Sequence, residues 1–95
     1  MLVSSDSAFL QALGQRIREL RKQKGWSQQE LAYRIGMEKS NLSVIENGKS
    51  NPQILTLVRI ACTLEVQPLE LLQFELEIPQ FIEARGAYQP RKHKR

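Results

Sequence analysis

Glycine and proline residues divide this 95-residue chain into short segments, and this division constrains its fold more than any other feature. Gly25, Gly36 and Gly48 each follow a stretch with apolar residues at helical spacing. Pro52 and Pro68 each precede another such stretch. Glycine takes the left-handed conformation that ends many helices, and proline suits the first helical position. The chain is therefore expected to form several short helices joined by tight turns.

The apolar spacing predicts five helices, of which only the first is long. Asp6 or Ser7 is expected as the N-cap of this first helix. The second helix begins with a capping box, in which the Ser27 hydroxyl and the Glu30 carboxylate accept from each other's backbone amides. In the fourth, Ile54 is expected to face inward. The five helices are expected over residues 7–24, from Ser27 to Gly36, and over 38–47, 53–64 and 68–72.

The pattern changes after residue 72. Residues 74–78 alternate at period two, which predicts a short strand, although apolar pairs four residues apart leave a continued helix open. A lone strand is not stable by itself, so this segment needs a partner. Residues 86–95 have no apolar periodicity and are expected to form a disordered basic tail.

Composition excludes several classes of protein. One cysteine and one histidine exclude an internal disulfide framework and argue against a zinc site, so we expect neither a metal nor a cofactor. No apolar run approaches the roughly 18 residues that span a bilayer, and the N-terminus lacks the basic residues of a secretory signal. Because His93 lies in the basic tail and Cys62 has no plausible base, we expect no enzyme. The expected protein is soluble, cytoplasmic and without a membrane partner.

The net charge of +4 is unevenly distributed along the chain. Residues 16–49 carry eight basic and four acidic side chains, whereas residues 50–84 are predominantly acidic and residues 85–95 carry no acid. A basic block beside an acidic block indicates one face directed at a polyanion and another kept away from it. Ordinary solvated surface charge is the alternative.

Two short helices joined by a glycine-containing turn, after a longer amphipathic helix, form a helix-turn-helix pattern. With this pattern the sequence resembles the Xre/Cro-type helix-turn-helix transcriptional regulators, to which the lambdoid phage repressors belong. The resemblance covers residues 11–72 and implies an all-α, five-helix repressor-like domain. The short C-terminal strand predicted from the period-two pattern would serve in dimerisation. The resemblance is carried by Leu20-Arg21, Gly25-Trp26-Ser27-Gln28, Glu30-Leu31-Ala32, Ile35-Gly36, Leu42-Ser43, Ile45-Glu46-Asn47-Gly48, Pro52, Leu57, Ile60-Ala61 and Leu64.

The resemblance implies that the third helix, residues 38–47, lies in the major groove of DNA and the second crosses above it. Arg21 and Glu46 are implied to form an ion pair that joins the first and third helices. Other residues are expected to contact DNA, and the alternative for them is simple exposure to solvent. Those expected to read bases are Lys39, Ser40, Val44 and Asn41. Those expected to contact phosphate are Gln28, Ser43, Asn47, Lys49 and Ser50.

Three positions depart from the pattern of the family, and one of them is Gln67, a poor cap for the fifth helix. Glu38 stands where Ser or Thr usually caps the third helix, and its carboxylate near the groove would repel phosphate. Glu65 stands where glycine often ends the fourth helix. None of these three departures breaks the expected fold.

Apolar residues accumulate at the end of the fold, and family members usually bind palindromes as two-fold dimers with half-sites about 10 bp apart. We therefore expect a homodimer through residues 66–84, with antiparallel pairing of residues 74–78 as one arrangement. Packing of this segment against the first and fifth helices is the alternative. The expected interface residues are Leu69, Leu72, Phe74, Leu76, Ile78, Phe81 and Ile82.

Together these expectations describe a sequence-specific transcriptional regulator that binds double-stranded DNA in the cytoplasm of a prokaryote, on the nucleoid, or in a phage. An antitoxin or protein-interaction module with secondary DNA binding stays open, in a toxin–antitoxin or restriction–modification controller setting with a cognate toxin or other partner protein. The expected organisation is an N-terminal arm at 1–6, the helix-turn-helix DNA-binding domain at 7–72, a dimerisation segment at 73–85 and the tail at 86–95.

Overall fold

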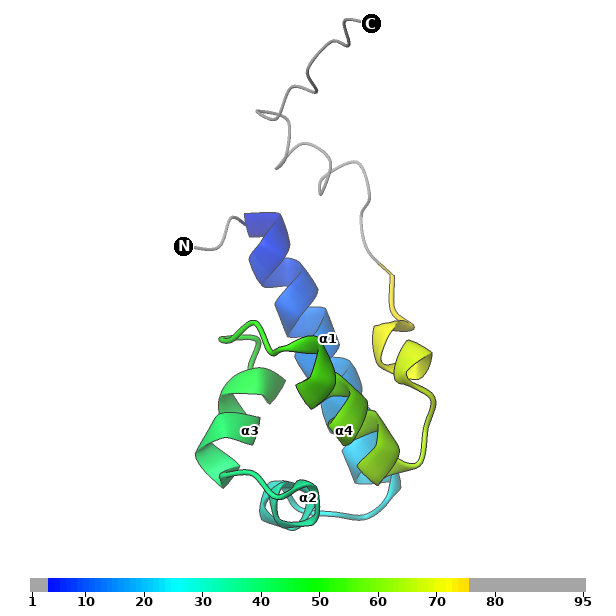
Figure 1. The fold of residues 1–95 in the computed structure, drawn as a ribbon. Coiled ribbons are helices and arrows are strands. Elements are labelled where there is room, and N and C mark those ends of the chain that lie inside the picture. Colours follow the sequence, from blue (N-terminus) through cyan, green and yellow to red (C-terminus); the bar gives the residue numbers. More distant parts are fainter. Residues whose placement is uncertain (1–3, 76–95) are drawn as a thin grey trace, which may run out of the picture.

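Helices form all the regular structure in residues 4–75, the part of the chain that the computed structural model describes (Figure 1). The expected all-α class and the order of the helices are confirmed. Four of the helices are α-helical, and the fifth is a 3-10 helix. Their bounds are α1 (Ser4–Gln23), α2 (Gln28–Ile35), α3 (Lys39–Glu46), α4 (Ile54–Leu64) and η1 (Pro68–Leu72).

The two ends of the described chain differ from the expectation. Helix α1 begins at Ser4, so residues 4–6 of the expected N-terminal arm are helical. The helix runs without a break from Ser4 to Gln23, and Asp6 in its first turn interacts favourably with the helix dipole. Phe74 and Glu75 do not form a strand. Leu76, Ile78, Phe81, Ile82 and the basic tail lie outside the described residues.

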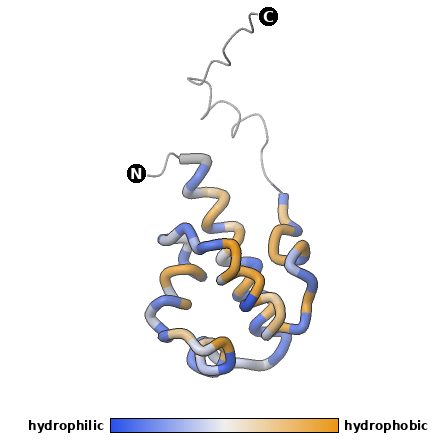
Figure 2. The backbone as a smooth tube through the Cα atoms, viewed as in Figure 1, coloured by the Kyte–Doolittle hydropathy of each residue, from blue (hydrophilic) through white to orange (hydrophobic). Residues whose placement is uncertain are grey.

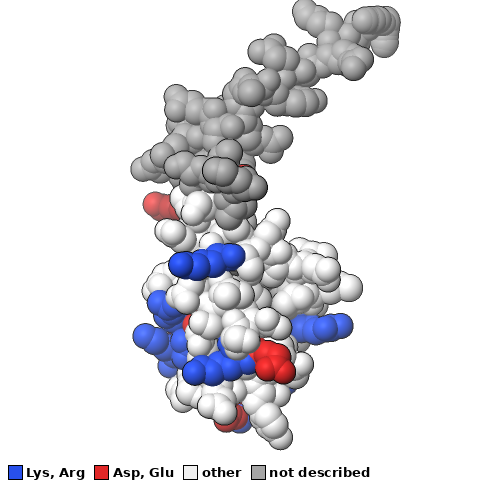
Figure 3. All heavy atoms as spheres, turned by 90° about the vertical axis from the view of Figure 1, so that its left-hand side faces the viewer, with Lys and Arg blue, Asp and Glu red and all other residues white. Residues whose placement is uncertain are grey.

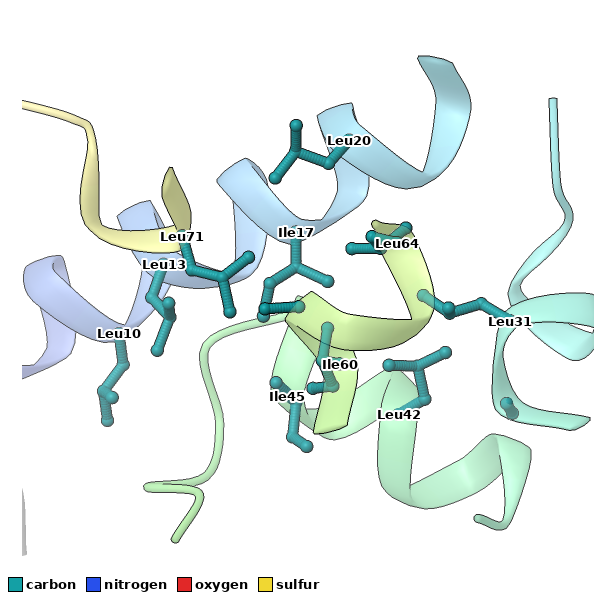
Figure 4. Packing of buried hydrophobic residues seen from close by; sticks show 12 residues of the cluster. Leu10, Leu13, Ile17, Leu20, Leu31, Leu42, Ile45, Ile60, Leu64 and Leu71 are labelled. Atoms are coloured by element: carbon teal, nitrogen blue, oxygen red, sulfur yellow. The ribbon is translucent and has the colours of Figure 1, made fainter. Parts of the chain in front are cut away.

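The core lies beside the buried face of α1, on which α3 and η1 pack, while α2 packs on α3 and α4. Figure 2 shows hydrophobic residues alternating with hydrophilic ones along α1, and Figure 4 shows side chains from the different helices meeting in one interior. Full burial of each such side chain stabilises the fold by about 1.5–3 kcal/mol. The fully buried large residues are Ile17, Leu31, Leu42, Ile60, Leu64 and Leu71. No helix within residues 4–75 is long and apolar enough to cross a membrane.

The capping box at the start of α2 is only half formed. The Ser27 hydroxyl accepts from the Glu30 amide at 3.0 Å, as expected. The Glu30 carboxylate does not return the bond within the described residues, because it accepts from Arg34 Nε at 2.6 Å instead. At the other end of α2, Gly36 has a φ of 88° and ends the helix in the left-handed conformation. Both ends of α2 therefore follow local sequence signals. At its start, however, the Glu30 carboxylate pairs with Arg34 and not with the Ser27 amide.

Helix α4 ends at a residue that is not a glycine. Glu65 adopts a left-handed φ of 63°, and its carboxylate pairs with Lys24 after the first helix. The Lys24 ammonium, by hydrogen bond and charge, lowers the pKa of Glu65 below its ordinary value. This contact links the end of α4 to the turn between α1 and α2.

Candidate nucleic-acid interface

Helix α3 presents one buried face and one exposed face. Leu42 and Ile45 are buried against the core, which turns the opposite side of the helix to solvent. Lys39, Ser40, Asn41 and Val44, the expected base-reading residues, are exposed, and Val44 is 41% exposed. The geometry brings all four side chains to a surface that no other described helix covers.

A buried ion pair holds this surface in place. Arg21 on α1 donates to the Glu46 carboxylate on α3 through Nε at 2.8 Å and through Nη2 at 2.9 Å. Arg21 is 8% exposed and Glu46 is 2% exposed. A two-point contact between a guanidinium and a carboxylate fixes both groups in orientation. The pair therefore sets the position of α3 relative to α1.

Two further side chains bind the same carboxylate, and sequence reasoning missed this. Gln28 Nε2 donates to Glu46 Oε1 at 3.0 Å, and Arg18 Nε lies 3.5 Å from the same oxygen. Arg18 also donates to Asn47 Oδ1 at 2.9 Å. The available signal was the spacing of Arg18 and Arg21, since residues three apart share a helix face. Gln28 and Asn47, both expected to contact phosphate, are thus held by this network.

Most of the expected phosphate-contacting residues lie near the C-terminal end of α3. Gln28, the first residue of α2, donates to Glu46, the last residue of α3, while Asn47 and Lys49 are exposed just beyond that end. Ser43 and Ser50 are half-buried, and the Ser43 hydroxyl accepts from Asn47 Nδ2 at 3.4 Å. Hydrogen-bond donors therefore gather beside the C-terminal end of α3, next to its exposed face.

The charge around α3 is mainly positive. Figure 3 views the side of the molecule that carries α3, and most of the coloured side chains there are Lys or Arg. A hollow of about 450 Å³ opens near the start of α2 and is lined by Arg18, Lys22 and Lys39 among others. Cations and the free amides at a helix N-terminus both favour an anion. This surface suits a polyanion such as DNA.

Comparison with known proteins identifies the family. A family model described as "Helix-turn-helix domain" matches residues 14–77. The chain belongs to the Xre-type helix-turn-helix family of DNA-binding transcriptional regulators. The resemblance found in the sequence is thereby confirmed.

Relatives of this helix-turn-helix protein are transcriptional regulators and an antitoxin. The regulator SinR of Bacillus subtilis is 46% identical over 61 residues, which cover 63% of this chain and 55% of SinR. Antitoxin HipB of Escherichia coli is 38% identical over 47 residues, half of each chain. The helix-turn-helix protein thus spans about half the length of these curated relatives.

Solved structures share the fold. The restriction-modification controller protein C.AhdI from Aeromonas hydrophila has a TM-score of 0.66 and 39% identity, covering 67% of this chain and 97% of its own. SinR, solved in complex with DNA, has a TM-score of 0.60 and 45% identity, covering 64% of this chain and 98% of its own. The helices described above therefore have the arrangement of a helix-turn-helix domain.

The helix-turn-helix protein also exposes apolar side chains away from α3. Leu69 and Leu72, expected at a dimer interface, are 68% and 45% exposed, whereas Phe74 is half-buried against Phe9, with ring centroids 5.4 Å apart. Ile54 was expected inside but is 69% exposed, and Leu55 beside it is 63% exposed. Ile54 is the first residue of α4, where the helix has not yet reached the core.

Proposed function

We propose that this protein is a sequence-specific regulator that binds a palindromic operator in double-stranded DNA as a homodimer, with α3 in the major groove. The observation that carries the proposal is the exposed face of α3, whose position is fixed by the buried Arg21–Glu46 pair. The solved complex of SinR with DNA, at 45% identity, supports the same use of this chain.

The exposed residues of α3 match the chemistry of base edges. Lys39 can donate to O6 and N7 of guanine, and Ser40 and Asn41 can bond to several bases. Val44 can pack against the methyl group of thymine. Gln28, Ser43, Asn47, Lys49 and Ser50 are proposed to contact phosphate, which positions the protein without reading sequence.

Replacement of Lys39 and Lys49 by alanine, one at a time, separates base readout from phosphate binding. Lys39→Ala is expected to relax base preference at one operator position, because it removes a donor to the base edge. Lys49→Ala is expected to weaken binding to all sequences and to reduce the slope of log K against log salt by about 1. The reason is that binding then displaces one counterion fewer from the DNA. Sequences selected from a random DNA pool, followed by affinity measurements at several salt concentrations, provide the test. If both variants weaken specific and random DNA equally, the readout assigned to Lys39 is wrong.

Dimerisation is proposed to use the exposed apolar side chains of η1, with residues 73–85 continuing the interface. Replacement of Leu69 by glutamate is expected to convert a dimer into a monomer at micromolar concentration, since it places a charge in an apolar contact. Sedimentation over a concentration series measures this change. Tyr33→Ser is a matched control, because Tyr33 is 81% exposed but lies on α2. A wild-type chain that is monomeric at every micromolar concentration contradicts the dimer.

The identity to antitoxin HipB favours a second candidate function, binding of a cognate toxin or other partner protein with DNA binding secondary. The two functions would use different surfaces: DNA recognition the exposed face of α3, and partner binding the exposed apolar side chains. Partner binding through the apolar side chains would be unchanged in Lys39→Ala, whereas the base preference at one operator position would be relaxed.

A further inference from the structure

Glu38 lies at the start of α3, and its carboxylate has no partner among residues 4–75. It is the N-cap residue, with φ −70° and ψ 140°, but its side chain accepts no capping hydrogen bond. Ser27, the N-cap residue of α2, does cap its helix, because its hydroxyl accepts from the Glu30 amide at 3.0 Å. Glu38 is exposed and, within residues 4–75, forms neither an ion pair nor a side-chain hydrogen bond. Helix capping therefore does not explain a glutamate at this position.

Neighbouring carboxylates in the helix-turn-helix unit are neutralised by arginine. Glu30 on α2 accepts from Arg34 at 2.6 Å, and Glu46 on α3 accepts from Arg21 at 2.8 Å. Glu38 differs because its carboxylate forms no ion pair within residues 4–75, on the surface proposed to face DNA. Such a charge repels phosphate and weakens the attraction that supplies non-specific binding. A hydrogen-bond donor on a DNA base could offset this cost in the bound state.

The surroundings of Glu38 place it next to the proposed base-reading residues. It lines a hollow of about 310 Å³ between α2 and α3, together with Gln29, Tyr33 and Lys39. Lys39 follows it directly, so the two Cα atoms are about 3.8 Å apart. The N-terminal residues of a recognition helix are those that contact base edges. If Lys39 reaches a base edge, the Glu38 carboxylate starts from the neighbouring backbone position on the same side of the hollow.

We propose that Glu38 is a specificity-determining residue, whose carboxylate accepts a hydrogen bond from an exocyclic amino group in the major groove. Only cytosine, through N4, and adenine, through N6, present such a donor there. Guanine and thymine present the acceptors O6 and O4, which repel a carboxylate. This inference rests on the proposed function, and it turns an unfavourable surface charge into a source of discrimination.

Selection of bound sequences from a random DNA pool, with wild type, Glu38→Ser and Glu38→Gln, tests the inference. Wild type is expected to enrich cytosine or adenine at one position by roughly tenfold over guanine and thymine. Glu38→Ser is expected to lose the preference at that position alone, while it binds all DNA more tightly at low salt. Glu38→Gln is expected to weaken the preference, because the amide carries a donor as well as an acceptor. Glu30→Gln removes the same charge from α2 and is expected to keep the wild-type profile.

Methylated operators identify the amino group. If cytosine is read, N4-methylcytosine at the selected position lowers wild-type affinity and leaves Glu38→Ser unaffected. If adenine is read, N6-methyladenine has that effect. An unchanged base profile in Glu38→Ser, with tighter binding to every sequence, overturns this inference and leaves the proposed function standing. A wild-type protein that enriches no sequence overturns both.

Discussion

Replacement of Glu46 by leucine is expected to lower the free energy of unfolding by about 3–5 kcal/mol, the usual cost of removing one partner of a buried ion pair. The Glu46 side chain is fully buried, and Arg21 beneath it is only 8% exposed. Without the carboxylate, the Arg21 guanidinium keeps its desolvation cost and loses two of its hydrogen bonds. Urea unfolding followed by circular dichroism measures the change.

The double variant Arg21→Met, Glu46→Leu is the matched control for this prediction. Apolar residues in place of both charges are expected to recover most of the lost stability, because neither charge is then buried alone. Arg18 and Gln28 are partly exposed, and water can replace their bonds to Glu46. If the double variant is as unstable as Glu46→Leu, loss of packing rather than the unpaired charge explains the effect.

Replacement of Gly14 by alanine is expected to destabilise the fold by about 1–3 kcal/mol, although alanine is the better helix former by about 1 kcal/mol. A Cβ at residue 14 would lie 2.5 Å from the carbonyl oxygen of Ile45 and against that of Glu46. These are backbone atoms at the end of α3, so relief requires that the whole helix move. Because α3 carries the proposed base-reading residues, DNA affinity is expected to fall as well.

Gly25→Ala separates this steric effect from a conformational one. Gly25 has a φ of 76°, but a Cβ there would meet nothing within 4 Å. Its replacement is expected to cost about 1 kcal/mol from backbone strain alone and to leave DNA affinity unchanged. Thermal unfolding and DNA titration of both variants compare the two effects. A Gly14→Ala protein more stable than wild type shows that α1 and α3 are not packed as described.

The helices of this protein were predictable because their signals are local. Gly36 needs a left-handed backbone, Ser27 reaches an amide three residues away, and Pro68 supplies the φ of a first turn. Each of these preferences acts over one helical turn, so a single sequence reveals it. The family resemblance then added the expected Arg21–Glu46 pair, which spans 25 residues and has no local signal.

Other features depended on partners distant in the chain. The sequence indicated that Glu30 would cap α2 with Ser27, but Arg34 competes for its carboxylate. It placed Ile54 in the core by its spacing, but the first turn of α4 lies at the surface. Periodicity gives the face of a helix and not the extent to which a neighbour covers it.

By itself, the sequence determined the helical class, the turns and the concentration of basic residues around the two short helices, because backbone preferences and charge are properties of the residues themselves. Only the tertiary structure decided that Glu46 binds Arg21, Arg18 and Gln28, and that Glu38 has no partner in the described part of the chain. The physical reason is that a side chain's hydrogen bonds depend on how the helices pack in three dimensions. The difference between these two glutamates, eight residues apart on one helix, exists only in the folded protein.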